Sequence, residues 1–189
     1  LWAKRLAGVS TRMVISAHNT LSQTTAIAAD VRGKWMPAIV KRFYPWADGI
    51  VAVSKGVADE LSQKTGIPRN QIEAIYNPVL TPEFKEKVKE TIDHPWFQKG
   101  QPPVILSVGR LSPQKDSASL IKAFVKVCKN RSARLMIIGE GPDRPQLERL
   151  IETLNLKEDV LLPGFIPNPY PYMSQATSFV CSSQWEGLS

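Results

Sequence analysis

Residues 104–116 read VILSVGRLSPQKD, so that a run of apolar and small residues leads directly into a polar loop. Apolar runs of this length that are rich in β-branched residues are typical of strands buried on both faces of a parallel sheet. The apolar residues after the loop fall at helical spacing, namely Leu120, Ile121, Phe124, Val125 and Cys128. A further buried strand is predicted at residues 134–138. This order of strand, loop, helix and strand predicts a parallel α/β unit.

The same alternation extends in both directions along the chain. Further strands are predicted at residues 13–16, 49–53, 72–76, 160–162 and 178–181. Ser54 is a good N-cap for a helix that carries Val57, Ala58 and Leu61, and Gly66 should end that helix. We therefore predict an α/β fold with Rossmann-like parallel sheets and helices on both faces.

The pattern loosens between residues 78 and 103, where prolines recur, a charge run covers residues 85–90 and no strand is predicted. A length of 189 residues permits parts of two domains, if one domain takes about 150 residues. We expect residues 1–80 to be the later part of a first domain, residues 81–102 to be an interdomain linker, and residues 103–189 to be an incomplete second domain.

The composition excludes several classes of protein. With 43% hydrophobic and 22% charged residues, the chain is neither disordered nor fibrous. No apolar run approaches the roughly 18 residues that a membrane span needs. Cys128 and Cys181 show no zinc or disulfide spacing, so we expect thiols in a reducing cytosol. Leu1 is not an initiator Met and no signal segment follows it, so we expect an excerpt of a longer, non-secreted chain.

The net charge is +7, and it is unevenly distributed. Residues 1–49 hold seven basic and two acidic side chains, a net of +5. Such a surface could meet nucleic acid, an anionic bilayer or a phosphorylated small molecule, or could be a solvated face without a partner. The basic residues occur singly or in pairs, and no zinc-finger or aromatic ribonucleoprotein signature is present, which disfavours nucleic acid.

Functional residues should lie in the loops that leave the strands, because ligands of open parallel sheets bind beyond the carboxyl ends of the strands. In the loop after residue 108, Gly109 lets the backbone approach a ligand. The guanidinium of Arg110 offers a planar fork of N–H donors, and the ammonium group of Lys115 offers a compact positive charge. Together the two groups suit a diphosphate. The alternative is that both are solvent-exposed loop charges.

Two later loops are also candidates. The loop GEGPDR at residues 139–144 resembles the start of the dinucleotide-binding fingerprint G-x-G-x-x-G, but Arg144 replaces the third glycine of that fingerprint. A tight turn with Pro142 in the first turn of the next helix is the favoured alternative. In SSQWEGLS at residues 182–189, Glu186 either accepts hydrogen bonds from sugar hydroxyls or is an acid favoured at a helix start.

Taken together, these loops resemble glycosyltransferase family 4, whose members are retaining nucleotide-sugar enzymes built from two Rossmann-like domains in the GT-B architecture. The similar segments cover most of the chain, and their order is more specific than any one of them. They are VILSVGRL at 104–111 with Lys115, GEGP at 139–142, LPGF at 162–165, SSQWEG at 182–187, VSKG at 53–56, YNPV at 76–79, and His18 after the first strand.

The resemblance implies a role for each matching residue. Arg110 and Lys115 would hold the donor diphosphate and stabilise it as a leaving group, so that no metal ion or other cofactor is needed. Glu186 would bind hydroxyls of the donor sugar, and His18 would lie near the transferred sugar and the acceptor. The remaining contacts to the nucleotide would come from the backbone at Gly109, Phe165, Ile166, Gly187 and Leu188.

The implied function is transfer of a sugar from a nucleotide-diphosphate donor to a sugar, polysaccharide or lipid-linked acceptor, with retention of configuration, in the cytoplasm or at the inner face of the membrane. Three departures count against full activity. Asp116 stands where the family usually has glycine and should weaken donor binding. The second glutamate of the family's paired motif would fall past Ser189, and the start of the acceptor domain would lie before Leu1. We therefore expect the chain alone to be nearly inactive.

Two other function classes stay open at this point. One is a non-catalytic interaction module that uses its basic front end on an anionic surface. The other is a nicotinamide dehydrogenase, which the incomplete glycine fingerprint makes the weakest of the three.

Overall fold

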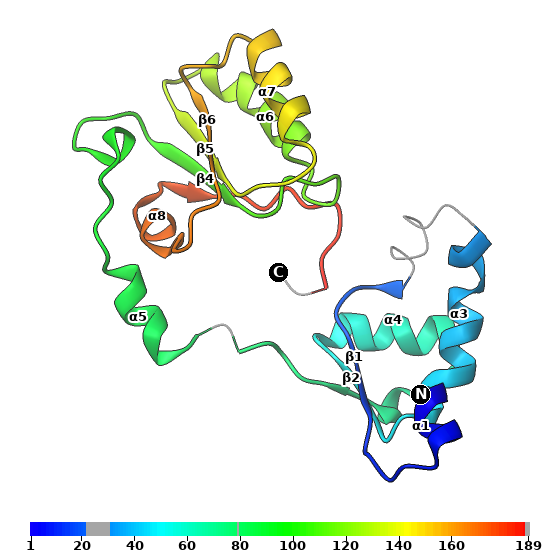
Figure 1. Cartoon of the computed structure of the whole chain (residues 1–189). Coiled ribbons are helices and arrows are strands. Elements are labelled where there is room, and N and C mark those ends of the chain that lie inside the picture. The colour runs from blue at the N-terminus through cyan, green and yellow to red at the C-terminus, as the bar shows by residue number, and fades with distance from the viewer. Residues whose placement is uncertain (22–30, 79, 188–189) are drawn as a thin grey trace. The chain divides into compact units, whose positions relative to one another are not determined.

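The computed structural model describes residues 1–21, 31–78 and 80–187 (Figure 1). The chain divides into two compact units. The first comprises Leu1–Val79 with Trp185–Ser189, and the second comprises Leu80–Gln184. The two units are described one at a time.

The first unit is built on a parallel sheet of order β1-β2-β3. Its strands are β1 (Val14–Ala17), β2 (Gly49–Ala52) and β3 (Ile72–Ala74), near the predicted positions. Among the described residues, further helices accompany α4 (Lys55–Thr65), namely α1 (Trp2–Ala7), α3 (Val31–Phe43), η1 (Tyr44–Trp46) and η2 (Arg69–Gln71). The core joins one face of α4 to the sheet, through Val57, Ala58 and Leu61 on the helix and Ile50 and Ile72 on the strands.

Helix α4 begins and ends as predicted. Ser54 Oγ accepts a hydrogen bond from the backbone N–H of Val57 at 3.2 Å, a cap that contributes about 1 kcal/mol to helix stability. At the other end, Gly66 adopts a left-handed φ of 72° and its N–H returns to the carbonyl of Ser62. Glycine suits this position because a Cβ disfavours positive φ.

The second unit contains a parallel sheet of order β6-β5-β4-β7. Its strands are β4 (Val104–Val108), β5 (Arg134–Ile138), β6 (Val160–Gly164) and β7 (Ser178–Phe179), so the predictions for β4 and β5 are confirmed to the residue. After β6 the chain crosses over to pair β7 with the far side of β4. The direction of winding therefore reverses between β4 and β7, which is the topological switch point of a Rossmann-like sheet.

Helices cover both faces of this sheet, as predicted. Figure 1 shows α6 (Ser117–Cys128) and α7 (Arg144–Thr153) on one side, with α8 (Tyr170–Gln175) on the other. Alternate residues of β5 explain the arrangement. Leu135 and Ile137 pack with α6 and α7, whereas Met136 and Ile138 belong to the cluster on the other face, which includes Tyr172 of α8.

Residues 81–102, where a linker is expected, carry α5 (Pro82–Val88) and η3 (Pro95–Phe97). Both pack on α8. The rings of Phe84 and Tyr170 lie 4.8 Å apart in an edge-to-face arrangement, and Asn168 Nδ2 donates to the carbonyl of Lys87 at 2.9 Å. Phe97 makes the same kind of contact with Tyr172.

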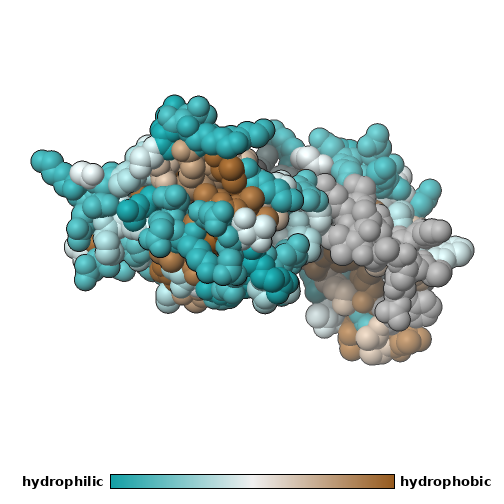
Figure 2. All heavy atoms as spheres, turned by 90° about the horizontal axis from the view of Figure 1, so that it is seen from above, coloured by the Kyte–Doolittle hydropathy of each residue, from teal (hydrophilic) through white to brown (hydrophobic). Residues whose placement is uncertain are grey.

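Several sequence predictions miss or misplace an element. Helices α1, α3, α5 and α8 were not predicted, and β7 is shorter than the predicted 178–181. The prediction that Pro142 lies in the first helical turn is wrong, because α7 begins at Arg144 with Pro145 in that turn. Among the described residues, no helix has the length and hydrophobicity to cross a membrane. Hydrophilic residues cover most of the face shown in Figure 2, and hydrophobic ones reach that surface in separate places.

Candidate functional site

The polar loops identified in the sequence lie at the carboxyl ends of the strands of the second unit. The loop 109–116 follows β4, and the segment 180–184 follows β7, so the two flank the switch point. This is the place where open α/β sheets bind their ligands.

A hollow of about 410 Å³ opens at this edge of the second sheet. It brings together predicted site residues from two loops, Gly109 and Arg110 after β4 with Phe165 and Ile166 after β6. Phe165 is 73% exposed, which leaves its ring free to stack on a planar ligand. The remaining walls come from the ends of β4 and β5 and from the loop before α8, through Val108, Ile138, Gly139, Glu140, Pro167 and Pro169.

Lys115 does not line this hollow, although it packs beside Gly109, which does. Its aliphatic chain crosses the glycine so closely that a Cβ at position 109 would stand 3.2 Å from Lys115 Cε. Lys115 lines a much smaller hollow with Cys181 and Ser182 of the segment after β7. The structure therefore brings Arg110 and Lys115 to one loop, but it assigns them to the walls of different hollows.

The glycines of the 139–141 turn allow two loops to touch. A Cβ at Gly139 would lie 1.9 Å from the carbonyl oxygen of Gly109, and one at Gly141 would lie 2.1 Å from that of Leu111. Backbone hydrogen bonds run between the same loops, from Gly109 N to the Ile138 carbonyl and from Leu111 N to the Glu140 carbonyl, each at 2.9 Å. These glycines serve loop packing, which accounts for the Gly-x-Gly without a dinucleotide.

Arg144, which replaces the third glycine of the dinucleotide fingerprint, is held in place by three acceptors. Its guanidinium pairs with Glu140 at 2.7 Å and with Glu148 at 2.9 Å, and it donates to the carbonyl of Leu162 in β6 at 2.8 Å. Arg144 therefore ties the start of α7 to the neighbouring strand and orients Glu140, whose side chain lines the larger hollow.

Asp116 caps helix α6 from a left-handed backbone conformation with φ of 47°. Its Oδ1 accepts from the N–H of Ser119 at 3.2 Å, and its Oδ2 accepts from Gln184 Nε2 at the same distance. Partial burial opposes ionisation, but these hydrogen bonds outweigh it and hold the pKa of Asp116 below its usual value. The positive φ explains why glycine is favoured at this position and why a short acid that forms a local cap is tolerated.

The other predicted residues belong to the first unit. Gly187 packs against the backbone of His18, since a Cβ at Gly187 would stand 1.7 Å from the carbonyl oxygen of His18. Ser54 Oγ donates to the carbonyl of Gly187 at 2.7 Å. The imidazole of His18 is exposed, and its Nε2 lies 3.1 Å from Ser16 Oγ. Glu186 is half-buried, and Leu188 lies outside the described residues.

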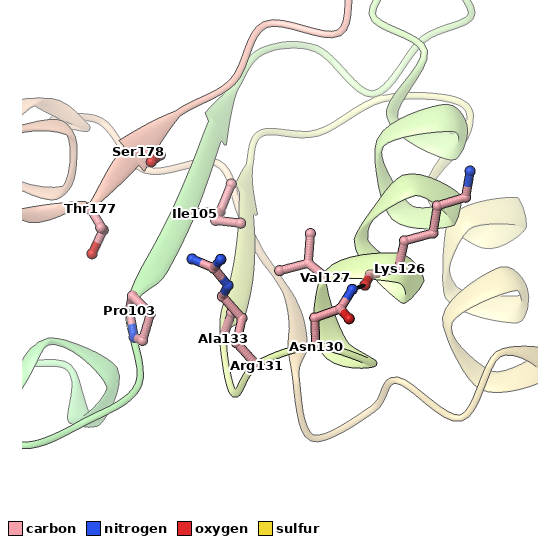
Figure 3. A pocket seen from close by; sticks show the side chains of 9 residues that line it. All are labelled: Pro103, Ile105, Lys126, Val127, Asn130, Arg131, Ala133, Thr177 and Ser178. Carbon is pink, nitrogen blue, oxygen red and sulfur yellow. Dashed lines mark hydrogen bonds between the residues drawn. The ribbon is translucent and has the colours of Figure 1, made fainter.

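A separate hollow of about 470 Å³ lies at the opposite end of the second sheet (Figure 3). Its side chains come from the start of β4, the last turn of α6, the connection from α6 to β5 and the start of β7, and include Ile105, Val127 and Arg131. None of the predicted site residues lines it. In the described part of the chain, no group of three or more His, Cys, Asp or Glu residues is arranged to hold a metal ion.

Three functional details could not be predicted from the pattern. The contact of Ser54 with Gly187 joins positions far apart in sequence, and so does the contact of Gln184 with Asp116. The ion pair that Arg144 forms with Glu140, which lines the hollow, is the third such detail. The sequence contained one hint of these contacts, which is Asp116 at a position where the family usually has glycine.

Comparisons with known proteins agree with this arrangement. The profile of the family described as glycosyl transferases group 1 matches residues 88–189, and the profile of glycosyltransferase family 4 matches residues 1–81. The chain is 35% identical over 185 residues, or 98% of its length, to the Campylobacter jejuni N-acetylgalactosamine-N,N'-diacetylbacillosaminyl-diphospho-undecaprenol 4-alpha-N-acetylgalactosaminyltransferase, and covers 48% of that protein. It is 34% identical over 78% of its length to an uncharacterized glycosyltransferase of Methanocaldococcus jannaschii, and covers 37% of that protein.

Solved structures show the same fold. A TarM variant from S. aureus, in complex with fondaparinux, alpha-GlcNAc-glycerol and UDP, matches 94% of this chain with a TM-score of 0.71 and 20% identity, over 33% of its own length. HepE from Anabaena, in complex with UDP and glucose, matches 96% of this chain with a TM-score of 0.67 and 20% identity, over 48% of its own length. The chain thus spans half or less of the length of these relatives. The resemblance inferred from the order of the motifs is confirmed, and the chain belongs to the glycosyl transferases of group 1, with a family 4 glycosyltransferase segment at its front.

Proposed function

We propose that the protein transfers a sugar from a nucleotide-diphosphate donor to a sugar, polysaccharide or lipid-linked acceptor, with retention of anomeric configuration. The observation that carries the proposal is the hollow of about 410 Å³, whose walls include Gly109, Arg110 and the exposed Phe165. A nucleotide needs this combination, because its base stacks and its phosphates take charge-assisted hydrogen bonds. Two structural relatives are described in complex with UDP.

In this proposal the second unit holds the donor. The backbone at Phe165 and Ile166 borders the base, and the ring of Phe165 covers it. Gly109 admits the diphosphate close to the main chain, where a side chain would collide with Lys115. The guanidinium of Arg110 lies on the same loop and can bind phosphate oxygens through two parallel N–H groups.

Departure of the nucleoside diphosphate builds negative charge on its outer phosphate, and cations placed for that charge lower the barrier. We assign this role to Arg110 and Lys115, which makes a metal ion or other cofactor unnecessary. The cost of ordering Lys115 is low because its side chain is already packed along Gly109.

We assign the sugar and the acceptor to the residues near His18 in the first unit. The imidazole of His18 would donate a hydrogen bond to the transferred sugar, Glu186 would accept from its hydroxyls, and the amides of Gly187 and Leu188 would face the distal phosphate. Ser54 supports this assignment because its hydroxyl fixes the carbonyl of Gly187. Retention of anomeric configuration can be tested on the full-length protein by measuring the coupling constant of the anomeric proton in the product.

The finer parts of the proposal concern the whole protein. Residues 1–80 would belong to an acceptor domain, residues 81–102 would connect the domains, and residues 103–189 would belong to the donor domain. The chain alone would have little transfer activity, and the protein would act in the cytoplasm or at the inner face of a membrane. One relative is named for a diphospho-undecaprenol substrate, which favours a lipid-linked acceptor. Membership in a glycosyltransferase family argues against the alternative function, a non-catalytic interaction module that binds an anionic surface.

The test is calorimetric titration of the chain with uridine diphosphate and guanosine diphosphate. Arg110→Ala and Lys115→Ala should each weaken binding about tenfold to a hundredfold, as expected for a lost hydrogen bond to a charged group. Arg149→Ala is the matched control, since it removes an exposed cation from α7 of the same unit. If neither loop substitution changed the affinity for the nucleotide, the assignment of the diphosphate to Arg110 and Lys115 would be wrong.

Cys181 provides a second readout of the same site, because it is exposed and lines the small hollow beside Lys115. Bound nucleotide should slow the alkylation of Cys181. The second thiol does not confuse the measurement, because burial, together with Asp159, raises the pKa of Cys128 and keeps it less reactive. An alkylation rate of Cys181 that is unchanged at saturating nucleotide would argue against a diphosphate beside Lys115.

A further inference from the structure

Asn168 lies between Pro167 and Pro169, two residues that line the hollow of about 410 Å³, and its side chain joins the ends of two helices. Its Nδ2 donates to the carbonyl of Lys87 at 2.9 Å, and its Oδ1 accepts from the N–H of Tyr170 at 3.3 Å. Lys87 lies in the last turn of α5 and Tyr170 begins α8, where backbone groups lack partners within their own helix. One side-chain amide therefore fixes the end of α5 against the start of α8.

A second contact ties the same two helices together (Figure 1). The rings of Phe84 in α5 and Tyr170 in α8 lie edge to face, with their centroids 4.8 Å apart, and both side chains are half-buried. An aromatic pair in this arrangement adds a directional attraction to the burial of its area. Helix α5 therefore docks on α8 through one polar and one aromatic contact.

The segment η3, which follows α5, packs behind the hollow. Ile138 and Ile166 line the hollow and also belong to the hydrophobic cluster on this face of the second sheet. Trp96 and Phe97 of η3 and Tyr172 of α8 belong to the same cluster, and the rings of Phe97 and Tyr172 lie 5.5 Å apart. Close-packed side chains transmit displacements, so the positions of η3 and α8 influence this wall of the hollow.

The two prolines make the wall sensitive to the bonds of Asn168. The ring of proline fixes φ at about −65°, so the backbone from Pro167 to Pro169 has few ways to adjust when Asn168 moves. Phe165 and Ile166, which are proposed to border the base, directly precede this segment. A displaced Asn168 would therefore displace the part of the wall that the base is proposed to contact.

We propose that Asn168 is a positioning residue for the nucleobase of the donor, and that nucleotide binding and the docking of α5 on α8 stabilise each other. The inference rests on the proposed function, because it takes the base to lie against residues 165–169. Coupling between two equilibria is reciprocal, so docked α5 favours the base and bound base favours docked α5. In the full-length protein α5 would lie in the connection between the domains, and bound donor would restrict that connection.

The diphosphate does not share this dependence. The loop after β4 is held by main-chain bonds, from Gly109 N to the Ile138 carbonyl and from Leu111 N to the Glu140 carbonyl. Asn168 takes no part in these bonds. Loss of its bond to α5 should therefore weaken the hold on the base and spare the hold on the phosphates.

The experiment compares the parent chain with Asn168→Asp, which still accepts from Tyr170 but cannot donate to the carbonyl of Lys87. The probes are uridine or guanosine diphosphate, whichever binds the parent more tightly, and inorganic pyrophosphate, which lacks the base. Calorimetry measures the nucleotide, and protection of Cys181 from alkylation measures the weaker pyrophosphate. Asn168→Asp should weaken nucleotide binding about threefold to tenfold, and pyrophosphate binding by less than about twofold.

Asn130→Asp is the matched control. Asn130 Nδ2 donates to the carbonyl of Lys126 at the same 2.9 Å, in the same unit but away from this hollow, so the substitution makes the same chemical change. Both affinities should equal those of the parent.

Phe84→Ala reaches the same link from α5. It should show the same selective loss of nucleotide affinity, and its combination with Asn168→Asp should lose less than the product of the two single losses, because both variants remove one docked arrangement. Nucleotide should also slow hydrogen exchange of the amides of α5 in the parent and in Asn130→Asp, but much less in Asn168→Asp. A merely structural role would lower the stability in urea without separating nucleotide from pyrophosphate.

The outcomes separate this inference from the function on which it rests. If Asn168→Asp bound the nucleotide as tightly as the parent does, the inference would be overturned while the donor site stood. Equal weakening of nucleotide and pyrophosphate would also overturn it, because the added negative charge or partial unfolding would then explain the effect. If the parent bound neither nucleotide, the proposed function would fail and the inference with it.

Discussion

Gln184 donates a hydrogen bond from its side-chain amide to Oδ2 of Asp116 at 3.2 Å, and so joins the segment after β7 to the loop after β4. Two neighbouring contacts reinforce the connection. The N–H of Gln184 donates to the carbonyl of Gln114 at 2.9 Å, and Ser182 Oγ donates to the carbonyl of Lys115 at 2.7 Å. Three consecutive residues of the loop that carries Lys115 are therefore fixed across the switch point.

Asp116→Asn should increase the affinity for uridine diphosphate about threefold to fivefold. The substitution keeps an oxygen for the cap of α6 but removes a negative charge from the loop that carries Lys115, and exposed charge interactions are worth up to about 1 kcal/mol. Calorimetry measures the change. Asp116→Ala separates charge from structure, because it also loses the cap and places a Cβ residue without local hydrogen bonds at φ of 47°. Unchanged affinity in Asp116→Asn would show that this carboxylate is too far from the ligand to matter.

Gly141→Ala should destabilise the second unit by about 3 kcal/mol, since the added Cβ would meet the backbone oxygen of Leu111 at 2.1 Å. Nucleotide binding should weaken as well, because the loop after β4 must move. Urea unfolding followed by circular dichroism measures the first effect. Gly56→Ala is the contrasting variant. Its Cβ would meet nothing closer than Ser54 Oγ at 4.0 Å, so helix α4 should gain about 0.5 to 1 kcal/mol.

The stability of the second unit should fall at mildly acidic pH because of His94. Its Nδ1 accepts from the N–H of Trp96 at 3.1 Å, and burial, with the nearby charge of Arg134, lowers the pKa of His94 below 6.5. Above that pH the imidazole is neutral in both states and its contribution is fully present. As the pH falls through the unfolded value toward the lower folded value, the unfolded chain binds more protons and the free energy of unfolding decreases.

The measurement compares the free energy of unfolding in urea between about pH 7.5 and pH 5 for the parent chain and for His94→Asn. Asparagine can accept from the same N–H but does not titrate. The parent should lose more stability than the variant over this interval. Parallel curves for the two proteins would mean that His94 does not contribute.

Removal of divalent cations should leave nucleotide binding unchanged to within about twofold, because Arg110 and Lys115 are proposed to neutralise the diphosphate in place of a metal ion. Calorimetry with and without EDTA measures this, and added magnesium reverses any chelation effect. A large loss of affinity in EDTA, restored by magnesium, would contradict the assignment of the charge role to these two side chains.

Strands β4 and β5 were predictable because each is a short apolar run that packs against neighbours on both faces of the sheet. Val104–Val108 and Arg134–Ile138 were predicted to the residue for this reason. Helix α4 was equally clear, since Ser54 and Gly66 mark its ends chemically. Helix α5 was missed because Pro82 lies in a charged, proline-containing stretch, where the contact between Phe84 and Tyr170 stabilises it. Local patterns do not carry that information.

The candidate site divides in the same way. Arg110 and Phe165 were predictable from loops that follow strands, and the fold brings them to one hollow. The sequence showed that Gly139 is typical of a turn, but it did not show why glycine is required there. The cause is a carbonyl of Gly109, thirty positions earlier in the chain, which the sequence does not reveal. The start of α7 was predicted too early, with Pro142 inside the helix. The helix starts at Arg144, whose side chain binds acceptors in α7 and β6, and the local sequence does not reveal these contacts.

The hydrogen bonds between the loops after β4, β5 and β6 join main-chain atoms, including that from Gly139 N to the carbonyl of Gly164 at 2.8 Å. The contour of this rim is consequently independent of most of the side chains that project from it. The exposed side chain of Phe165, for example, can be exchanged and leave the scaffold intact. In the proposed function, a rim of this design would let the choice of base and sugar change through surface replacements alone, provided that the glycines are retained.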